Sequence, residues 1–139
     1  MDFFEHLRED RNTNNRYAND AGIRITKISE GHAEAVVDLD ERHQNIIGSV
    51  HGGVYFTLAD STAGCVAASY GSYCTTVNSS IQYLSAAIGN RQLIAVADAI
   101  KHGKKLTVID VRISDETGRL LVQATMTFMS LEKPIIYQD

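Results

Sequence analysis

Cysteine and proline are scarce in this sequence, with two cysteines and one proline among 139 residues. Cys65 and Cys74 lack the paired spacing of a zinc site, so we expect no bound metal and reduced thiols, as in a cytoplasmic protein. Either thiol could act as a nucleophile, but the apolar neighbours of Cys65 favour core packing. The single proline, Pro134, lies near the C-terminal end and interrupts no predicted element.

Long apolar runs and a positive charge excess are also missing. No run approaches the roughly 18 apolar residues that cross a membrane. The N-terminal stretch MDFFEHLRED is too acidic for a secretory signal. The formal net charge is −4, whereas nucleic-acid-binding domains carry a basic excess or patch. We therefore expect neither membrane nor nucleic-acid partners.

The remaining composition is that of a soluble globular protein, with 44% hydrophobic and 22% charged residues. The length and the lack of repeats or linkers predict a single domain over residues 1–139. Residues 1–20 are interpreted as a short N-terminal helix followed by a loop through NTNNRYANDAG. One long Ala-rich helix is predicted from Gly52 to Tyr70. Strands are predicted at residues 22–29, 32–40, 75–84, 92–101, 105–114 and 119–131.

The order of these elements predicts the fold class. Two strands, one long helix and a meander of four strands joined by short turns indicate an antiparallel sheet. One apolar helix with one sheet gives an α+β architecture in which the sheet wraps around the helix. Small residues such as Ala59, Ala63 and Gly64 allow close approach to that helix. This arrangement is the hot-dog fold.

The start of the predicted helix, HGG at residues 51–53, is a candidate binding site. The first N–H groups of a helix lack intrahelical acceptors, and the positive end of the helix dipole lies there. Glycines at Gly52 and Gly53 let a ligand oxygen approach these amides, which suits a carbonyl that gains negative charge. Alternatively, the glycines only permit a tight turn into the helix.

Asp60 is the second candidate, because its neighbours are apolar and a buried carboxylate needs a partner. It could lie on an exposed stripe of the helix, or serve as a base or nucleophile in acyl transfer. Asp60 follows Gly52 by eight residues, roughly 12 Å along a helix, yet both must lie close to one reacting group. Two chains related by a twofold axis can satisfy both requirements, so the motif predicts a homodimer with shared sites.

Four stretches together resemble a known family. They are the pattern N…G..HGG….LAD beginning at Asn45, TVNSSIQYLSAA, KHGKKL and DETGRLLVQA. From about residue 20 to residue 131 the chain is similar to hot-dog thioesterases of the phenylacetic-acid-degradation type, which include mammalian acyl-CoA thioesterases. The resemblance implies hydrolysis of an acyl-CoA thioester without a cofactor, in a dimer or a dimer of dimers.

The resemblance also implies roles for single residues. Asp60 matches the general base or nucleophile, the Gly52 N–H binds the thioester oxygen, and Asn45 helps to hold that carbonyl. His51 supports the loop and polarises the site, and a hydroxyl across the dimer, at Thr76, orients the attacking water. The residues implied in substrate or coenzyme A binding are Gly53, Tyr83, Lys101, His102, Gly103, Lys104 and Lys105.

Three features of the sequence each have more than one interpretation. The KHGKK segment could clamp phosphates or form a solvated basic turn. Tyr55, Phe56 and Tyr73 could line an aromatic acyl pocket or belong to the core. Asn78 and Ala86 stand where the family often has aspartate and proline, which leaves the acyl group undefined.

Two other functions compete with thioester hydrolysis. Asp38 and His43, in the stretch DLDERH, have a spacing loosely similar to that in hot-dog hydratases, but the surrounding Asn-Pro context is missing. A non-catalytic acyl-CoA-binding protein is the third reading, although sensors of this fold carry an added DNA-binding segment for which this chain has no room.

Overall fold

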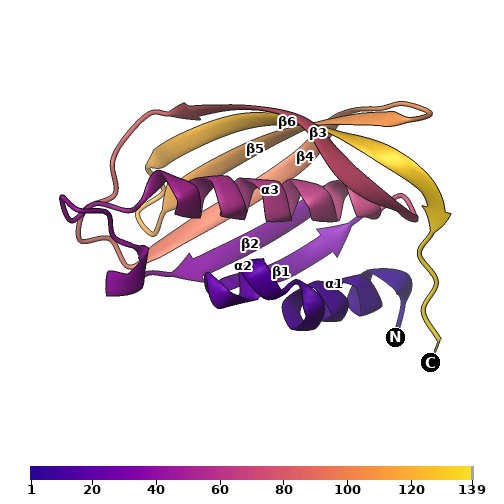
Figure 1. Cartoon of the computed structure of the whole chain (residues 1–139), viewed down its shortest axis with the longest axis horizontal. Helices are drawn as coiled ribbons and strands as arrows, with labels where there is room; N and C mark the ends of the chain where they lie inside the picture. Colours follow the sequence, from indigo (N-terminus) through magenta and orange to yellow (C-terminus); the bar gives the residue numbers. More distant parts are fainter. Residues whose placement is uncertain (139) are drawn as a thin grey trace.

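A single long helix, α3 (Gly52–Ala68), lies against the concave face of a six-stranded sheet in this computed structural model, which describes residues 1–138 (Figure 1). Alanine favours helix formation, and Leu58, Ala59 and Ala63 are fully buried against the sheet. After the end of α3, Gly71 has a φ of 100°, a positive value that glycine adopts readily and that stops the helix from continuing. The predicted long helix and the hot-dog fold are confirmed.

The sheet is entirely antiparallel, with strand order β1-β2-β4-β5-β6-β3. The strands are β1 (Ile23–Ser29), β2 (His32–Asp38), β3 (Ser72–Tyr83), β4 (Gln92–His102), β5 (Leu106–Asp115) and β6 (Leu120–Pro134). All six predicted strands are present, with ends shifted by up to three residues.

The predicted four-strand meander is wrong in one respect. Strand β4 pairs with β2, and β3 pairs with β6 at the sheet edge, so only β4, β5 and β6 form a meander. The reason is the connection of residues 84–91, which is long enough to carry the chain from the edge strand β3 past β6 and β5 to β4 in the middle of the sheet. Within it Ala87 is buried and its carbonyl accepts from the Val50 N–H at 3.1 Å, just ahead of α3.

The predicted N-terminal loop is helical instead. Helix α1 (Phe3–Asn14) begins with a capping box between Asp2 and Glu5, and α2 (Arg16–Asp20) follows it directly. The Asn12 side chain donates to the Ile25 carbonyl and accepts from the Ile25 N–H, at 2.9 and 2.8 Å. Asn12, one of the asparagines that suggested a loop, therefore docks α1 onto β1.

A paired histidine on the sheet yields a prediction about pH. His32 on β2 bonds Glu34 and Asp98, each at 2.7 Å, and these bonds raise the pKa of His32. A raised folded-state pKa stabilises the fold below the unfolded value of about 6.5, and this contribution disappears as pH rises through the folded-state pKa. We expect His32→Gln to lower the free energy of unfolding by up to about 1 kcal/mol at mildly acidic pH, and by less at alkaline pH. Urea unfolding of both proteins across that range measures the difference, and a constant difference would contradict the assignment.

Among residues 1–138, none of the helices is both long and apolar enough to cross a membrane.

Candidate active site

Asp60 and Thr76 meet within one chain, and not across the dimer as the family resemblance implied. Asp60 lies in the middle of α3, and Thr76 lies on the edge strand β3, where its Oγ1 donates to Asp60 Oδ1 at 2.7 Å. Both side chains are partly buried. Thr76 uses its only hydroxyl proton in this bond, so its lone pairs remain available to an external donor such as water. The contact joins two of the predicted catalytic residues across 16 positions of sequence.

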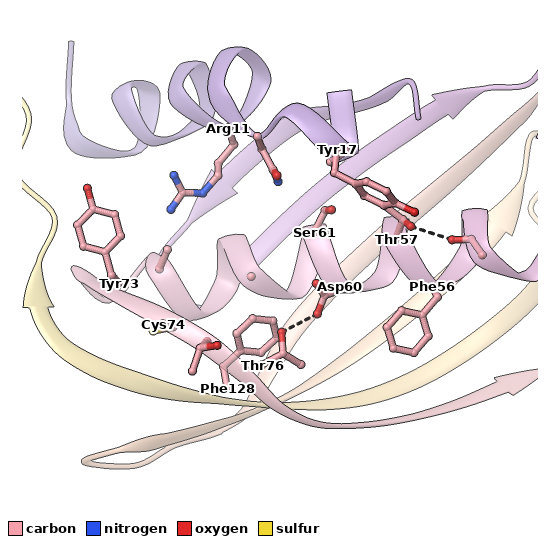
Figure 2. A pocket seen from close by; sticks show the side chains of 16 residues that line it. Arg11, Tyr17, Phe56, Thr57, Asp60, Ser61, Tyr73, Cys74, Thr76 and Phe128 are labelled. Carbon is pink, nitrogen blue, oxygen red and sulfur yellow. Dashed lines mark hydrogen bonds between the residues drawn. The ribbon is translucent and has the colours of Figure 1, made fainter. Parts of the chain in front are cut away.

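The two residues line a pocket of about 690 Å³ between α3, β3 and the N-terminal helices (Figure 2). Its apolar walls include Phe56, Tyr73 and Phe128. Three aromatic residues were expected to line an acyl pocket or to belong to the core. Phe56 and Tyr73 line the pocket, whereas Tyr55 is buried in the core with 4% exposure.

The pocket also has lining residues that sequence reasoning missed. Arg11 and Asn15 reach it from the N-terminal helices, and Phe128 reaches it from β6. No local motif marks these residues, because their position depends on how α1 and α2 dock onto the rest of the chain.

The N-terminus of α3 leaves one backbone donor available. His51 is the N-cap, and its Nδ1 accepts from the Gly53 N–H at 2.8 Å, which requires the proton of a neutral His51 to be on Nε2. The Gly52 N–H has no hydrogen-bond acceptor within residues 1–138. A Cβ on Gly53 would lie 3.0 Å from His51 Nδ1, so glycine permits the cap. Gly52 therefore remains as the free donor at this helix end.

Tyr83 covers the same helix end. Its hydroxyl donates to the Gly52 carbonyl at 3.4 Å, and its ring meets Tyr55 edge-on with 6.0 Å between centroids. Tyr83 is 52% exposed. A ligand approaching Gly52 would pass beside this ring.

Asn45 organises the loop that leads into α3. Its Oδ1 accepts from the N–H groups of Ile47 and Ser49, and its Nδ2 donates to Ser49 Oγ at 2.8 Å. The amide oxygen is thus committed to the loop, while one of the two Nδ2 protons is not used by these bonds. Asn45 shapes the approach to Gly52 through the backbone.

The basic turn lies at the opposite end of α3 from Gly52. His102, at the end of β4, stacks on Tyr70 with 3.6 Å between ring centroids, and Tyr70 follows the last turn of α3. Helix α3 spans 17 residues, or roughly 25 Å. The predicted coenzyme A residues therefore divide into two groups, Tyr83 at one end of the helix and the lysines of residues 101–105 at the other.

The remaining candidates have structural roles. Burial raises the pKa of the Cys65 thiol to about 12 and raises that of Cys74 as well, so both stay protonated at neutral pH. His43 is 2% exposed and bonds the Ala21 carbonyl at 2.7 Å, while Asp38 pairs with Arg24. Within residues 1–138 no cluster of three or more histidine, cysteine or acidic side chains could hold a metal ion.

Comparison with known proteins identifies the family. Residues 47–122 match the thioesterase superfamily. Human acyl-coenzyme A thioesterase 13 is 30% identical over 109 residues, which cover 75% of this chain and 78% of the relative. A hypothetical thioesterase from Streptococcus pneumoniae TIGR4, solved with coenzyme A, is 31% identical with a TM-score of 0.77, covering 81% of this chain and 91% of that one.

The fold agrees over a longer span with the E. coli PaaI protein from the phenylacetic acid degradation operon. That structure gives a TM-score of 0.87 at 23% identity and covers 96% of this chain and 99% of that chain. Its coverage includes most of the N-terminal segment, where α1 and α2 lie. On the family match and these relatives, the chain belongs to the thioesterase superfamily and is a thioester hydrolase.

Proposed function

We propose that the protein hydrolyses acyl-CoA thioesters, with Asp60 as the general base or nucleophile. The observation that carries this proposal is the Asp60–Thr76 hydrogen bond inside a pocket large enough for an acyl group. The named activity of the human relative and the coenzyme A bound to the pneumococcal protein support the substrate class. The pneumococcal protein was also solved with an aspartate and, separately, a threonine changed to alanine, 16 positions apart as Asp60 and Thr76 are here.

Asp60 and Thr76 act on the attacking water in this scheme. Thr76 fixes one carboxylate oxygen of Asp60 and accepts a hydrogen bond from the water, while Asp60 takes a proton from it. The water oxygen attacks the thioester carbon, the C–S bond breaks, and the proton passes to the leaving thiolate. The products are a carboxylic acid and the coenzyme A thiol. Direct attack by Asp60 would instead form an acyl-aspartate anhydride that water then hydrolyses.

Gly52 supplies the hydrogen-bond donor for the thioester oxygen, while Asp60 acts on the water. Its free N–H lies at the positive end of the α3 dipole, and such a donor stabilises the oxyanion that forms at the thioester carbonyl. Gly52 and Asp60 are eight residues apart on one rigid helix, a rise of roughly 12 Å. The two groups therefore act on one substrate only when they come from different chains.

A dimer with antiparallel α3 helices would form two such sites. The free edge of the sheet favours it, because β3 is twelve residues long and an exposed edge strand is a template for pairing. Val77 on this strand is 48% exposed. The same pairing would bring Tyr83 of one chain toward the basic turn of its partner. The two separated groups of coenzyme A residues would then meet at one site.

The basic turn yields a prediction. Lys101, Lys104 and Lys105 are exposed, and only Lys105 has an ion pair within residues 1–138, with Glu132 at 3.8 Å. We expect replacement of all three with glutamine to raise KM by about tenfold, since each exposed charge contributes about 0.5 kcal/mol. The value of kcat should change little, because phosphate contacts persist from ground to transition state.

Steady-state kinetics at low and high salt measure this effect, which salt should screen. Lys27→Gln, on β1 and also exposed, is the matched control and should leave KM unchanged. A loss confined to kcat in the triple variant would show that the turn has a structural role instead.

A panel of acyl-CoA thioesters assayed for thiol release tests the proposed function. Release of coenzyme A thiol is expected with at least one class of acyl group. Binding without thiol release would make the protein an acyl-CoA-binding module. Hydration of an enoyl-CoA without release would make it a hydratase, a reading that the burial of His43 disfavours.

A further inference from the structure

The pocket continues well beyond the proposed catalytic residues. From Asp60 it follows α3 to Ala68, eight residues further on, which is a rise of roughly 12 Å. At this far end its walls include Arg11 and Tyr73. Figure 2 shows the Arg11 side chain pointing from α1 toward the C-terminal half of α3, away from Asp60. All of these residues belong to one chain.

The Arg11 side chain is held at this end of the pocket by its bond to Asp10. It is 21% exposed, and its Nη1 donates to Asp10 Oδ2 at 2.6 Å. Asp10 also accepts from Asn14 Nδ2 at 2.7 Å and from the Tyr137 hydroxyl at 3.0 Å. These bonds hold the carboxylate, and through it the guanidinium, against α1 and the C-terminal segment.

Part of the guanidinium is nevertheless available. Of its five N–H groups, one is bonded to Asp10, and within residues 1–138 neither Nε nor Nη2 has an acceptor. These two nitrogens form one edge of the guanidinium, the edge that binds a carboxylate through two parallel hydrogen bonds. Most of the Asp10 charge is already engaged by three donors, which reduces its repulsion of a second carboxylate.

We propose that the far end of the pocket binds a carboxylate at the terminus of the acyl group, so that the enzyme prefers ω-carboxyacyl-CoA substrates. This inference rests on the proposed function, with the thioester placed beside Asp60. An extended chain advances about 1.2 Å per bond, since the three backbone bonds of a residue span at most about 3.5 Å. The roughly 12 Å from Asp60 to Ala68 thus corresponds to about ten bonds, the length of a sebacyl group. Phe128, which lies beside Gly64, would contact the methylene chain between the two ends.

Binding to the Asp60→Asn variant tests the inference separately from turnover. Sebacyl-CoA and decanoyl-CoA differ only at the end of the acyl chain, where one has a carboxylate and the other a methyl group. The ratio of their dissociation constants therefore measures the preference for the carboxylate. We expect Arg11→Met, added to the Asp60→Asn variant, to lower the preference for sebacyl-CoA over decanoyl-CoA by about tenfold. This is the loss typical of a charge-assisted hydrogen bond. Adipyl-CoA and hexanoyl-CoA, whose chains are too short to reach Arg11, should show no such dependence on Arg11.

Arg16→Met is the matched control, because Arg16 is an exposed arginine on α2 that does not line the pocket. Arg11→Gln, which keeps a donor for Asp10, is the second variant if Arg11→Met does not fold. A change of less than twofold in the sebacyl preference, or an equal change with Arg16→Met, would overturn the inference. Thiol release from decanoyl-CoA by the wild type would in that case leave the proposed function intact.

Discussion

Replacing Asp60 with asparagine is expected to lower kcat for acyl-CoA hydrolysis by at least ~10²-fold, the usual contribution of a general base. The loss should be larger if the carboxylate is the nucleophile. Asparagine is nearly isosteric, and its amide oxygen can still accept from Thr76, whose hydroxyl bonds Asp60 Oδ1 at 2.7 Å. The fold and the binding of coenzyme A should therefore survive. Thiol release at saturating substrate measures kcat.

Thr76→Ala is the comparison variant for this experiment. It removes the hydroxyl that holds Asp60 but leaves the carboxylate in place, so its kcat should fall by less than that of Asp60→Asn. Asp60→Glu should retain a fraction of the activity, because the longer side chain keeps the charge but misplaces it. Near-normal turnover by Asp60→Asn, with ligand binding intact, would rule out the proposed mechanism.

Gly52→Pro is expected to lower kcat by about 10²–10³-fold, the range for loss of one oxyanion donor. Gly52 is the first residue of α3, a position where helices accept proline because its N–H has no intrahelical partner. The preceding residue, His51, has φ of −64° and ψ of 136°, which is the extended conformation that proline requires before it. The substitution thus removes the proposed donor while the helix can still form.

Gly52→Ala separates this effect from crowding. An added Cβ would meet the Tyr83 ring at 3.7 Å, an ordinary van der Waals contact, and the N–H would remain. We expect Gly52→Ala to keep most of the activity that Gly52→Pro loses. Equal losses in both variants would mean that space beside Tyr83, and not the N–H, is what matters at this position.

The helix and its motif were readable from sequence because their signals are local. The alanines of α3, the HGG stretch and one carboxylate at Asp60 all lie within twenty residues, and their spacing along a helix follows from its geometry. The strands were equally readable, since turns such as the one at Gly118 separate them. The Asp60–Thr76 contact within one chain was not readable from residue spacing, and the family resemblance implied a hydroxyl from across the dimer instead.

Features that depend on long-range packing were predicted wrongly or missed. The position of β3 beside β6 depends on the path of residues 84–91 past β6 and β5, which the local sequence does not predict. The Asn-rich segment looked like a loop because the bonds of Asn12 to Ile25 are tertiary contacts. Arg11 was missed for the same reason, as only the docking of α1 brings it to the pocket.

The most direct test of the shared site is the activity of mixed dimers. Chains with Asp60→Asn and chains with Gly52→Pro, each nearly inactive alone, are combined in equal amounts under conditions of proven subunit exchange. Each hybrid dimer would contain one site with both substitutions and one intact site. Random pairing makes half of the dimers hybrids, so roughly one quarter of the wild-type activity per chain should return. Activity that stays at the level of the two parent variants would show that Asp60 and Gly52 do not act across the dimer, which contradicts the proposed site.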